Sequence, residues 1–177
     1  MQPLIFDTSP LSQFARIERL GVLRAIVGER RSIIPQAVVV ELQRGVQSDP
    51  RIREVLEASW IEQRGTQTDD ELAVYAGFAS RLVSGDRNVG DAAVLALART
   101  LPGQAVIDDS VAHRLGTEAG VSCTRTLALL CDGIREGLLT LEEVSDLADE
   151  LIATDYRLPF GPGDFIMWAK NNDLVPD

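Results

Sequence analysis

The chain has 177 residues, of which 45% are apolar, 25% charged and 5% aromatic, enough to bury the core of one ordinary domain. Its 17 basic and 27 acidic residues give a net charge of −10. That charge excludes a protein that coats nucleic acid with a basic surface, but not an enzyme that contacts nucleic acid at one small site. Cys123 and Cys131 form no CxxC motif, so we expect neither a disulfide scaffold nor a structural zinc site.

Membrane and export signals are not expected in this sequence. No window approaches the ~18 consecutive apolar residues that a membrane-spanning helix needs. Residues 1–7 lack a basic start and a long apolar stretch, so they do not resemble a signal peptide. We therefore expect a cytoplasmic protein with no membrane association.

Short apolar runs typical of buried strands alternate with helical patterns along the chain. The strand-like runs are 3–6, 32–34, 104–107 and 121–123. The expected helices span 20–27, 35–45, 51–60, 69–83, 91–101, 109–120, 126–136 and 140–153, the last with a capping box from Thr140 to Glu143. Strands separated by helices predict an α/β fold, a three-layer α/β/α sandwich around a short parallel sheet.

Two acidic residues directly follow predicted strands. Asp7 ends the first strand and Asp108, with Asp109 beside it, ends the third. Because the carboxyl ends of parallel strands form the ligand-binding edge of such a sheet, these carboxylates are expected to converge. The alternative is that each only caps the helix that follows it.

Two further acids stand in apolar helices. Glu41 lies within residues 37–42 and shares a helix face with Val38, Leu42 and Gly45, where a carboxylate costs several kcal/mol unless it is paired or metal-bound. An ion pair with an arginine is the alternative. Asp91 opens a helix that stays apolar until Arg99, and helix capping is its alternative role. Together the acids predict a site for Mg²⁺ or Mn²⁺, of the kind that assists phosphodiester hydrolysis.

In this order, the acidic motifs resemble the PIN-domain family of metal-dependent ribonucleases, over roughly residues 4 to 140. More narrowly, they are similar to a branch with DTSPL, PxxVxxE, a GE-type helix start, xIDD and a TLGLL-like helix start. The matching segments here are DTSPL at 7–11, PQAVVVE at 35–41, GDAA at 90–93, IDD at 107–109 and TLALL at 126–130. The resemblance implies a domain over 1–140, with 141–177 as a helical extension packed on it.

The resemblance also implies the site and its partners. Asp7, Glu41, Asp91 and Asp108 would be catalytic and would bind Mg²⁺ or Mn²⁺, with Asp109 as a further ligand; Asp108 is favoured over Asp109 because it ends the strand. Asp91 stands where the branch usually has glutamate. The activity would be RNA cleavage, as the toxin of a toxin–antitoxin pair, with a small antitoxin protein as partner and a homodimer supported by the helices near residues 51–60.

Four residues are candidate contacts for the RNA substrate, namely Thr8, Ser9, Arg114 and Arg125. Helix capping is the alternative role for Thr8 and Ser9, and a solvated surface position is the alternative for Arg114 and Arg125. Two other functions remain open. One is a PIN-like module that binds nucleic acid or protein without cleaving. The other is a small-molecule phosphohydrolase of another α/β fold, which the absence of Walker A, GxGxxG and DxDx(T/V) motifs disfavours.

The acidic charge is unevenly distributed. Residues 141–177 hold nine acidic and two basic residues, a net charge of −7, which leaves −3 for residues 1–140. Without the five candidate site acids, residues 1–140 would carry +2. The acidity therefore describes a C-terminal segment and a candidate site rather than the whole surface.

Overall fold

A single five-stranded sheet organises the computed structural model, which describes residues 2–175. All strand pairs are parallel, in the spatial order β3-β2-β1-β4-β5. The strands are β1 (Leu4–Phe6), β2 (Ser32–Pro35), β3 (Ile61–Arg64), β4 (Gln104–Val106) and β5 (Ser122–Thr124). With all strands parallel, every strand ends at the same edge of the sheet, and the loops that follow them gather there.

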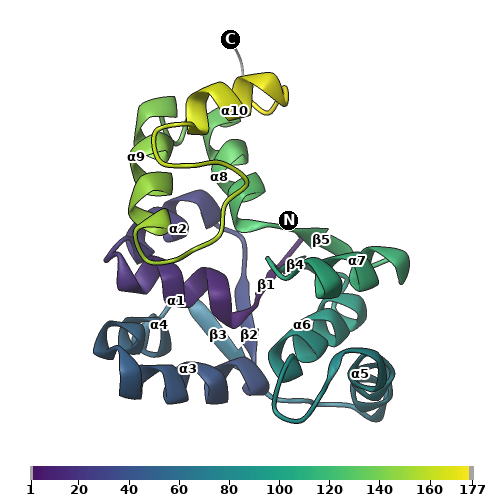
Figure 1. Ribbon diagram of the computed structural model, residues 1–177. Coiled ribbons are helices and arrows are strands. Elements are labelled where there is room, and N and C mark those ends of the chain that lie inside the picture. The colour runs from purple at the N-terminus through teal and green to yellow at the C-terminus, as the bar shows by residue number, and fades with distance from the viewer. Residues whose placement is uncertain (1, 176–177) are drawn as a thin grey trace.

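Helices cover both faces of this sheet (Figure 1). They are α1 (Thr8–Arg16), α2 (Leu20–Val27), α3 (Gln36–Ser48), α4 (Arg53–Glu57), α5 (Asp69–Leu82), α6 (Val89–Thr100), α7 (Ser110–Glu118), α8 (Thr126–Arg135), α9 (Leu141–Ile152) and α10 (Phe165–Asn171), with a 3₁₀ turn at Pro50–Ile52. Helix α6 packs on β1, β2 and β4, and α5 packs on α6; α1 and α2 lie on the opposite side of the sheet. The predicted α/β/α sandwich with a short parallel sheet is confirmed.

The core is apolar on both faces of the sheet because its central strands carry almost no polar residues. Leu4, Ile5 and Phe6 of β1 are fully buried, as are Ile33 and Ile34 of β2. Strands without polar alternation are typical of parallel sheets, since helices cover both of their faces. Burial fixes the backbone of β1 and β2, and so it fixes where the residues that follow them project.

Four elements differ from the sequence prediction, and one of them is helix α10, which lies beyond the last expected helix. Helix α1 was not predicted, although Pro10 stands in its first turn, where proline is tolerated. Strand β3 was missed because it is an edge strand in which only Ile61 is buried and Glu62 and Gln63 are exposed. The predicted helix over 51–60 is instead the 3₁₀ turn followed by the short α4.

The C-terminal helices pack on the rest of the molecule. The predicted capping box is confirmed, since Thr140 and Glu143 exchange side-chain to backbone hydrogen bonds at the start of α9. Helix α9 contacts α8 and α10, and Glu150 accepts a hydrogen bond of 2.7 Å from Arg19. The boundary at residue 140 stays a prediction. Within residues 2–175, no helix combines the length and apolarity needed to cross a bilayer.

Candidate active site

Asp7 is held at the end of β1 with its carboxylate almost fully buried, 8% exposed. It is the N-cap of α1 and accepts a long hydrogen bond of 3.4 Å from the Ser9 backbone N–H. Burial raises the pKa of Asp7 well above its ordinary value, and the charges of Asp91 and Glu41 raise it further. The capping role is therefore present, but it leaves a carboxylate that is poorly compensated and that faces other acids.

Glu41 reaches the same place from α3. Its Oε2 accepts a hydrogen bond of 2.5 Å from the Thr8 hydroxyl, and its Oε1 accepts one of 3.0 Å from the Gly90 backbone N–H. Glu41 is half-buried, and its neighbour Val40 is exposed, so the surroundings of Glu41 on α3 are less apolar than its sequence neighbours indicate. No ion pair with an arginine is present at Glu41 among the described residues.

Gly90 allows this approach between α3 and α6. A Cβ at this position would lie 2.8 Å from Oε2 and 2.9 Å from Oε1 of Glu41, too close for any real side chain. The glycine therefore lets the Glu41 carboxylate rest directly against the first turn of α6. The N-terminal end of a helix favours negative charge, which offsets part of the cost of placing Glu41 there.

Asp91 is the acid at this edge whose buried carboxylate has the least support from hydrogen bonds. It lies in the first turn of α6 and is 7% exposed, and the N-cap is Asn88, so Asp91 does not cap the helix. Its Oδ1 is buried without a hydrogen-bond partner. Burial, followed by the charges of Asp109 and Glu41, raises the pKa of Asp91 to about 7. A buried polar atom without a partner is rare in folded proteins and needs an explanation.

The neighbours Asp108 and Asp109 have different surroundings. Asp108 accepts hydrogen bonds from the Thr126 N–H at 2.9 Å, the Thr126 hydroxyl at 2.7 Å and the Tyr156 hydroxyl. Asp109 is exposed, and its Oδ1 caps α7 by accepting 2.9 Å bonds from the backbone N–H groups of Val111 and Ala112. The charge of Asp109 is the one that acts most strongly on Asp91.

The structure thus brings Asp7, Glu41, Asp91 and Asp109 near one another at the carboxyl edge of the sheet. The charges of Asp91 and Glu41 lie close enough to raise the pKa of Asp7, and the charges of Asp109 and Glu41 raise the pKa of Asp91. However, no three His, Cys, Asp or Glu side chains in residues 2–175 meet closely enough to form a complete cation site. The donors are all carboxylate oxygens, and Asp91 Oδ1 lacks a partner, so the chemistry of the set fits a hard divalent cation.

The predicted substrate contacts fall into two groups. Thr8 lies within the acidic edge, where its hydroxyl holds Glu41, and Ser9 contributes its backbone N–H to Asp7. The guanidinium of Arg125 donates to the Asp108 carbonyl at 2.8 Å and so braces the loop beside the acids. Arg114 is exposed on α7, 3.9 Å from Glu118, and lines a separate hollow with Arg81 and Leu82 of α5.

Sequence reasoning gave no role to the residues that hold the acids in place, although Gly90 and Thr126 stand in the quoted motifs. Thr126 and Tyr156 bind Asp108, and Gly90 binds Glu41. Gly90 had a signal, because it precedes an acid at the start of an apolar helix. Tyr156 had none, because it is 48 residues from Asp108 in the chain and follows no recognisable pattern.

The chain is a parallel α/β sandwich, and carboxylates from several of its elements lie near one another at the carboxyl edge of its sheet. The profile of the DUF3368 family, described as a PIN domain, matches residues 3–161, and the chain therefore belongs to the PIN-domain family. The matched region extends past the proposed boundary at residue 140 and includes Tyr156. No curated protein matches the chain significantly.

Proposed function

We propose that the protein is a metal-dependent ribonuclease that hydrolyses RNA phosphodiester bonds with Mg²⁺ or Mn²⁺. One observation carries the proposal. The Asp91 carboxylate is buried with an unpartnered Oδ1, among the charges of Asp7, Glu41 and Asp109. Such an arrangement is costly in the protein alone, and a divalent cation would relieve the cost.

Asp7, Glu41, Asp91 and Asp109 would hold the cation, which would supply a bound water of lowered pKa and positive charge near the phosphate. The chain's own residues set the positions of these acids. Thr8 and the Gly90 N–H each bind one oxygen of Glu41, so its carboxylate is oriented.

The surroundings of Asp108 and Asp109 favour Asp109 as the fourth ligand, in contrast to the preference from sequence. Both oxygens of Asp108 already accept hydrogen bonds from Thr126 and Tyr156. Asp108 would then act by fixing the loop that carries Asp109. Replacing Asp109 with asparagine should weaken Mn²⁺ binding measured by calorimetry, while Asp108→Asn should mainly lower the melting temperature. The opposite pattern would restore Asp108 as the ligand.

The test of the activity uses a labelled single-stranded RNA and a DNA of the same sequence, with Mg²⁺, Mn²⁺ or EDTA. We expect cleavage of RNA by the unaltered protein only with metal, and at least a hundredfold slower cleavage by Asp91→Asn. Asp146→Asn is the matched control, because Asp146 is an exposed acid on α9. RNA left intact with both metals would refute the proposal. Retention of that uncut RNA on a filter would then support the alternative of a non-cleaving binding module.

The finer role that the resemblance implies is the toxin of a toxin–antitoxin pair, acting in the cytoplasm as a homodimer. Membership of the PIN-domain family supports this role. Expression of the chain should arrest growth, and co-expression of a small adjacent reading frame should relieve the arrest. Light scattering should give twice the mass of one chain, and a monomer would refute the dimer.

A further inference from the structure

The turn that follows α9 directs Tyr156 into the body of the molecule. The backbone N–H groups of Thr154 and Tyr156 both donate to the Leu151 carbonyl, at 3.0 and 3.2 Å. Asp155 stands between them with a left-handed φ of 62°, a conformation that aspartate adopts more readily than most residues. The Thr154 hydroxyl lies within hydrogen-bond distance, 3.0 Å, of the Gln13 side chain on α1. The turn is therefore fixed against the rest of the chain, and Tyr156 is only 9% exposed.

Two hydroxyl groups from different elements meet at one oxygen of Asp108. The Thr126 hydroxyl, at the start of α8, donates to Oδ2 at 2.7 Å, and the Tyr156 hydroxyl donates to the same oxygen. The Thr126 N–H donates to Oδ1 at 2.9 Å. Hydrogen bonds to a carboxylate are about twice as strong as those between neutral groups. Three such bonds therefore hold the Asp108 side chain toward Thr126 and Tyr156.

The backbone of the same loop is fixed beside these bonds. The Arg125 guanidinium donates to the Asp108 carbonyl at 2.8 Å and to the Ser110 hydroxyl at 3.4 Å. Asp109, between Asp108 and Ser110, has an extended backbone with φ −61° and ψ 125°. Consecutive side chains on an extended backbone point to opposite sides. Because Asp108 is held toward Tyr156, the Asp109 side chain is directed away from it.

Asp109 lies on the side of the candidate cation site. Its Oδ1 accepts both capping bonds at the start of α7, so Oδ2 is the oxygen that would face a cation. Burial and then the charge of Asp109 raise the pKa of the Asp91 carboxyl, ahead of the charge of Glu41. Asp91 Oδ1 has no hydrogen-bond partner within residues 2–175. The direction that Asp108 imposes on Asp109 is therefore the direction of this buried acid.

We propose that Tyr156 and Thr126 are positioning residues of the ribonuclease. Their hydroxyls hold the Asp108 carboxylate on one side of the loop after β4, and this holds the Asp109 carboxylate on the other side, toward Asp91. The inference rests on the proposed function, because the direction of Asp109 matters only where the acids hold a cation. Segment 141–175 then contributes to the active site, since Tyr156 belongs to it.

The experiment measures Mn²⁺ binding to the full chain by calorimetry and thermal unfolding in EDTA by circular dichroism, so neither readout needs RNA cleavage. Tyr156→Phe removes the hydroxyl and keeps the buried ring. Groups that orient a metal ligand from outside typically contribute about 10–100-fold to metal affinity. We expect Tyr156→Phe to weaken Mn²⁺ binding about tenfold, at the lower end of that range, because Thr126 still binds Asp108.

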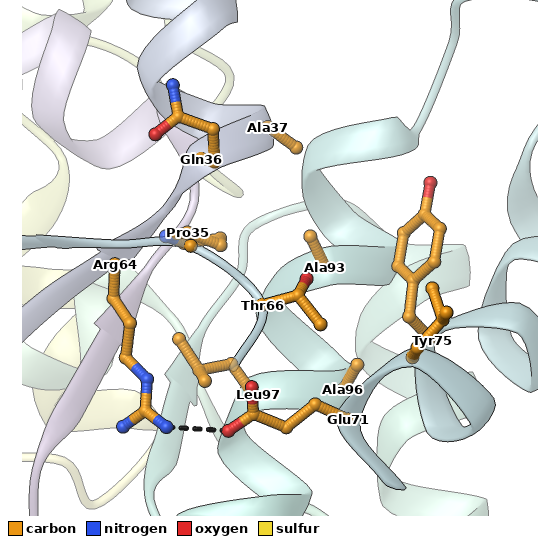
Figure 2. A pocket seen from close by; sticks show the side chains of 12 residues that line it. Pro35, Gln36, Ala37, Arg64, Thr66, Glu71, Tyr75, Ala93, Ala96 and Leu97 are labelled. Carbon is orange, nitrogen blue, oxygen red and sulfur yellow. Dashed lines mark hydrogen bonds and ion pairs between the residues drawn. The ribbon is translucent and has the colours of Figure 1, made fainter. Parts of the chain in front are cut away.

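Tyr75→Phe is the matched control, because it removes a tyrosine hydroxyl elsewhere in the structure. Tyr75 is half-buried on α5 and lines a pocket between α3, α5 and α6, which the five candidate site acids do not line (Figure 2). Figure 2 also shows the ion pair of that pocket, in which Arg64 lies 2.6 Å from Glu71. Tyr75→Phe should leave Mn²⁺ binding unchanged.

A double substitution separates positioning from a general loss of structure. If Tyr156 acts through Asp109, then Tyr156→Phe should not weaken Mn²⁺ binding further in an Asp109→Asn background. Its effect on the melting temperature in EDTA should be the same in both backgrounds, because the lost hydrogen bond to Asp108 is the same.

Thr126 tests the other hydroxyl with a pair of its own. Thr126→Val, which removes the hydroxyl, should weaken Mn²⁺ binding, and Thr126→Ser, which keeps it, should not. Asp108→Asn differs from these changes, because its amide can still bind both hydroxyls, which accept hydrogen bonds as well as donate them.

Unchanged Mn²⁺ affinity in Tyr156→Phe, equal weakening with and without Asp109→Asn, or equal affinities of Thr126→Val and Thr126→Ser would each overturn the inference. Should Tyr156→Phe not fold, the Thr126 pair decides alone. Absence of Mn²⁺ binding by the unaltered protein would overturn both the inference and the proposed function. A failure of the proposed function alone has a different signature, which is RNA left intact by an unaltered protein that binds Mn²⁺.

Discussion

Replacing Asp91 with asparagine should stabilise the metal-free protein at neutral and alkaline pH. The structure raises the pKa of this buried carboxyl from 3.8 to about 7. At about 1.4 kcal/mol per pKa unit, keeping Asp91 charged in the folded state costs up to about 4 kcal/mol. Asparagine removes the charge and keeps the shape. We therefore expect a gain of about 2–4 kcal/mol, or roughly 5–15 °C in melting temperature for a chain of this size.

The pH dependence gives the same prediction a second test. An acid with a raised pKa holds a proton in the folded state that the unfolded chain has already released. Asp91 therefore makes the unaltered protein lose stability as pH rises from about 4 to about 7, and Asp91→Asn lacks this loss. The stability curves of the two proteins should converge near pH 4 and separate above it.

The assay is thermal unfolding followed by circular dichroism in EDTA, from pH 4 to pH 8.5. Asp146→Asn, which removes one exposed acid from α9, controls for the change in net charge. Adding Mn²⁺ should raise the melting temperature of the unaltered protein more than that of Asp91→Asn. A variant that is no more stable than the unaltered protein at pH 8 would refute the reasoning from burial and charge.

Three other substitutions test the packing at the acidic edge and around α5. Gly90→Ala should displace the Glu41 carboxylate, because the new Cβ would lie 2.8 Å from its oxygen, and should lower RNA cleavage at least tenfold in a gel assay. Gly77→Ala is the control, because no atom lies within 4 Å of its new Cβ, and it should stabilise α5 by about 0.5–1 kcal/mol. Equal effects of Gly90→Ala and Gly77→Ala on RNA cleavage would contradict the contact assigned to Gly90. Glu71→Gln leaves Arg64 buried and unpaired, and should cost about 3–5 kcal/mol in urea unfolding. A cost below 1 kcal/mol would show that solvent reaches the pair.

Much of the fold was predictable from sequence because the central strands are almost entirely apolar. The runs at 3–6, 32–34 and 104–107 coincide with β1, β2 and β4 to within one residue. The edge strand β3 was not predictable in this way, since an edge strand needs to bury only one side and its polar residues face solvent. The hydrophobic pattern of a sequence reflects which residues are buried, so the pattern is weak in an element that is only partly buried.

The acidic edge was predictable only in part. The positions of Asp7 and Asp91 follow from local signals, because one ends a strand and the other begins an apolar helix. The distinction between Asp108 and Asp109 depends on Thr126 and Tyr156, which approach from other elements. The pocket lined by Arg64 and Tyr75 likewise forms between three helices, and no local sequence pattern predicts it.

The hydrogen bond from Tyr156 to Asp108 has a consequence for biosynthesis. The donor is made 48 residues after the acceptor, so the loop after β4 leaves the ribosome before its own anchor exists. Synthesis makes the N-terminal part of the chain available first. The sheet can therefore assemble early, while the loop that carries Asp108 and Asp109 gains its final support only after α9 and Tyr156 have packed. The anchoring of Asp108 beside the acidic edge is therefore one of the last contacts that the growing chain can form.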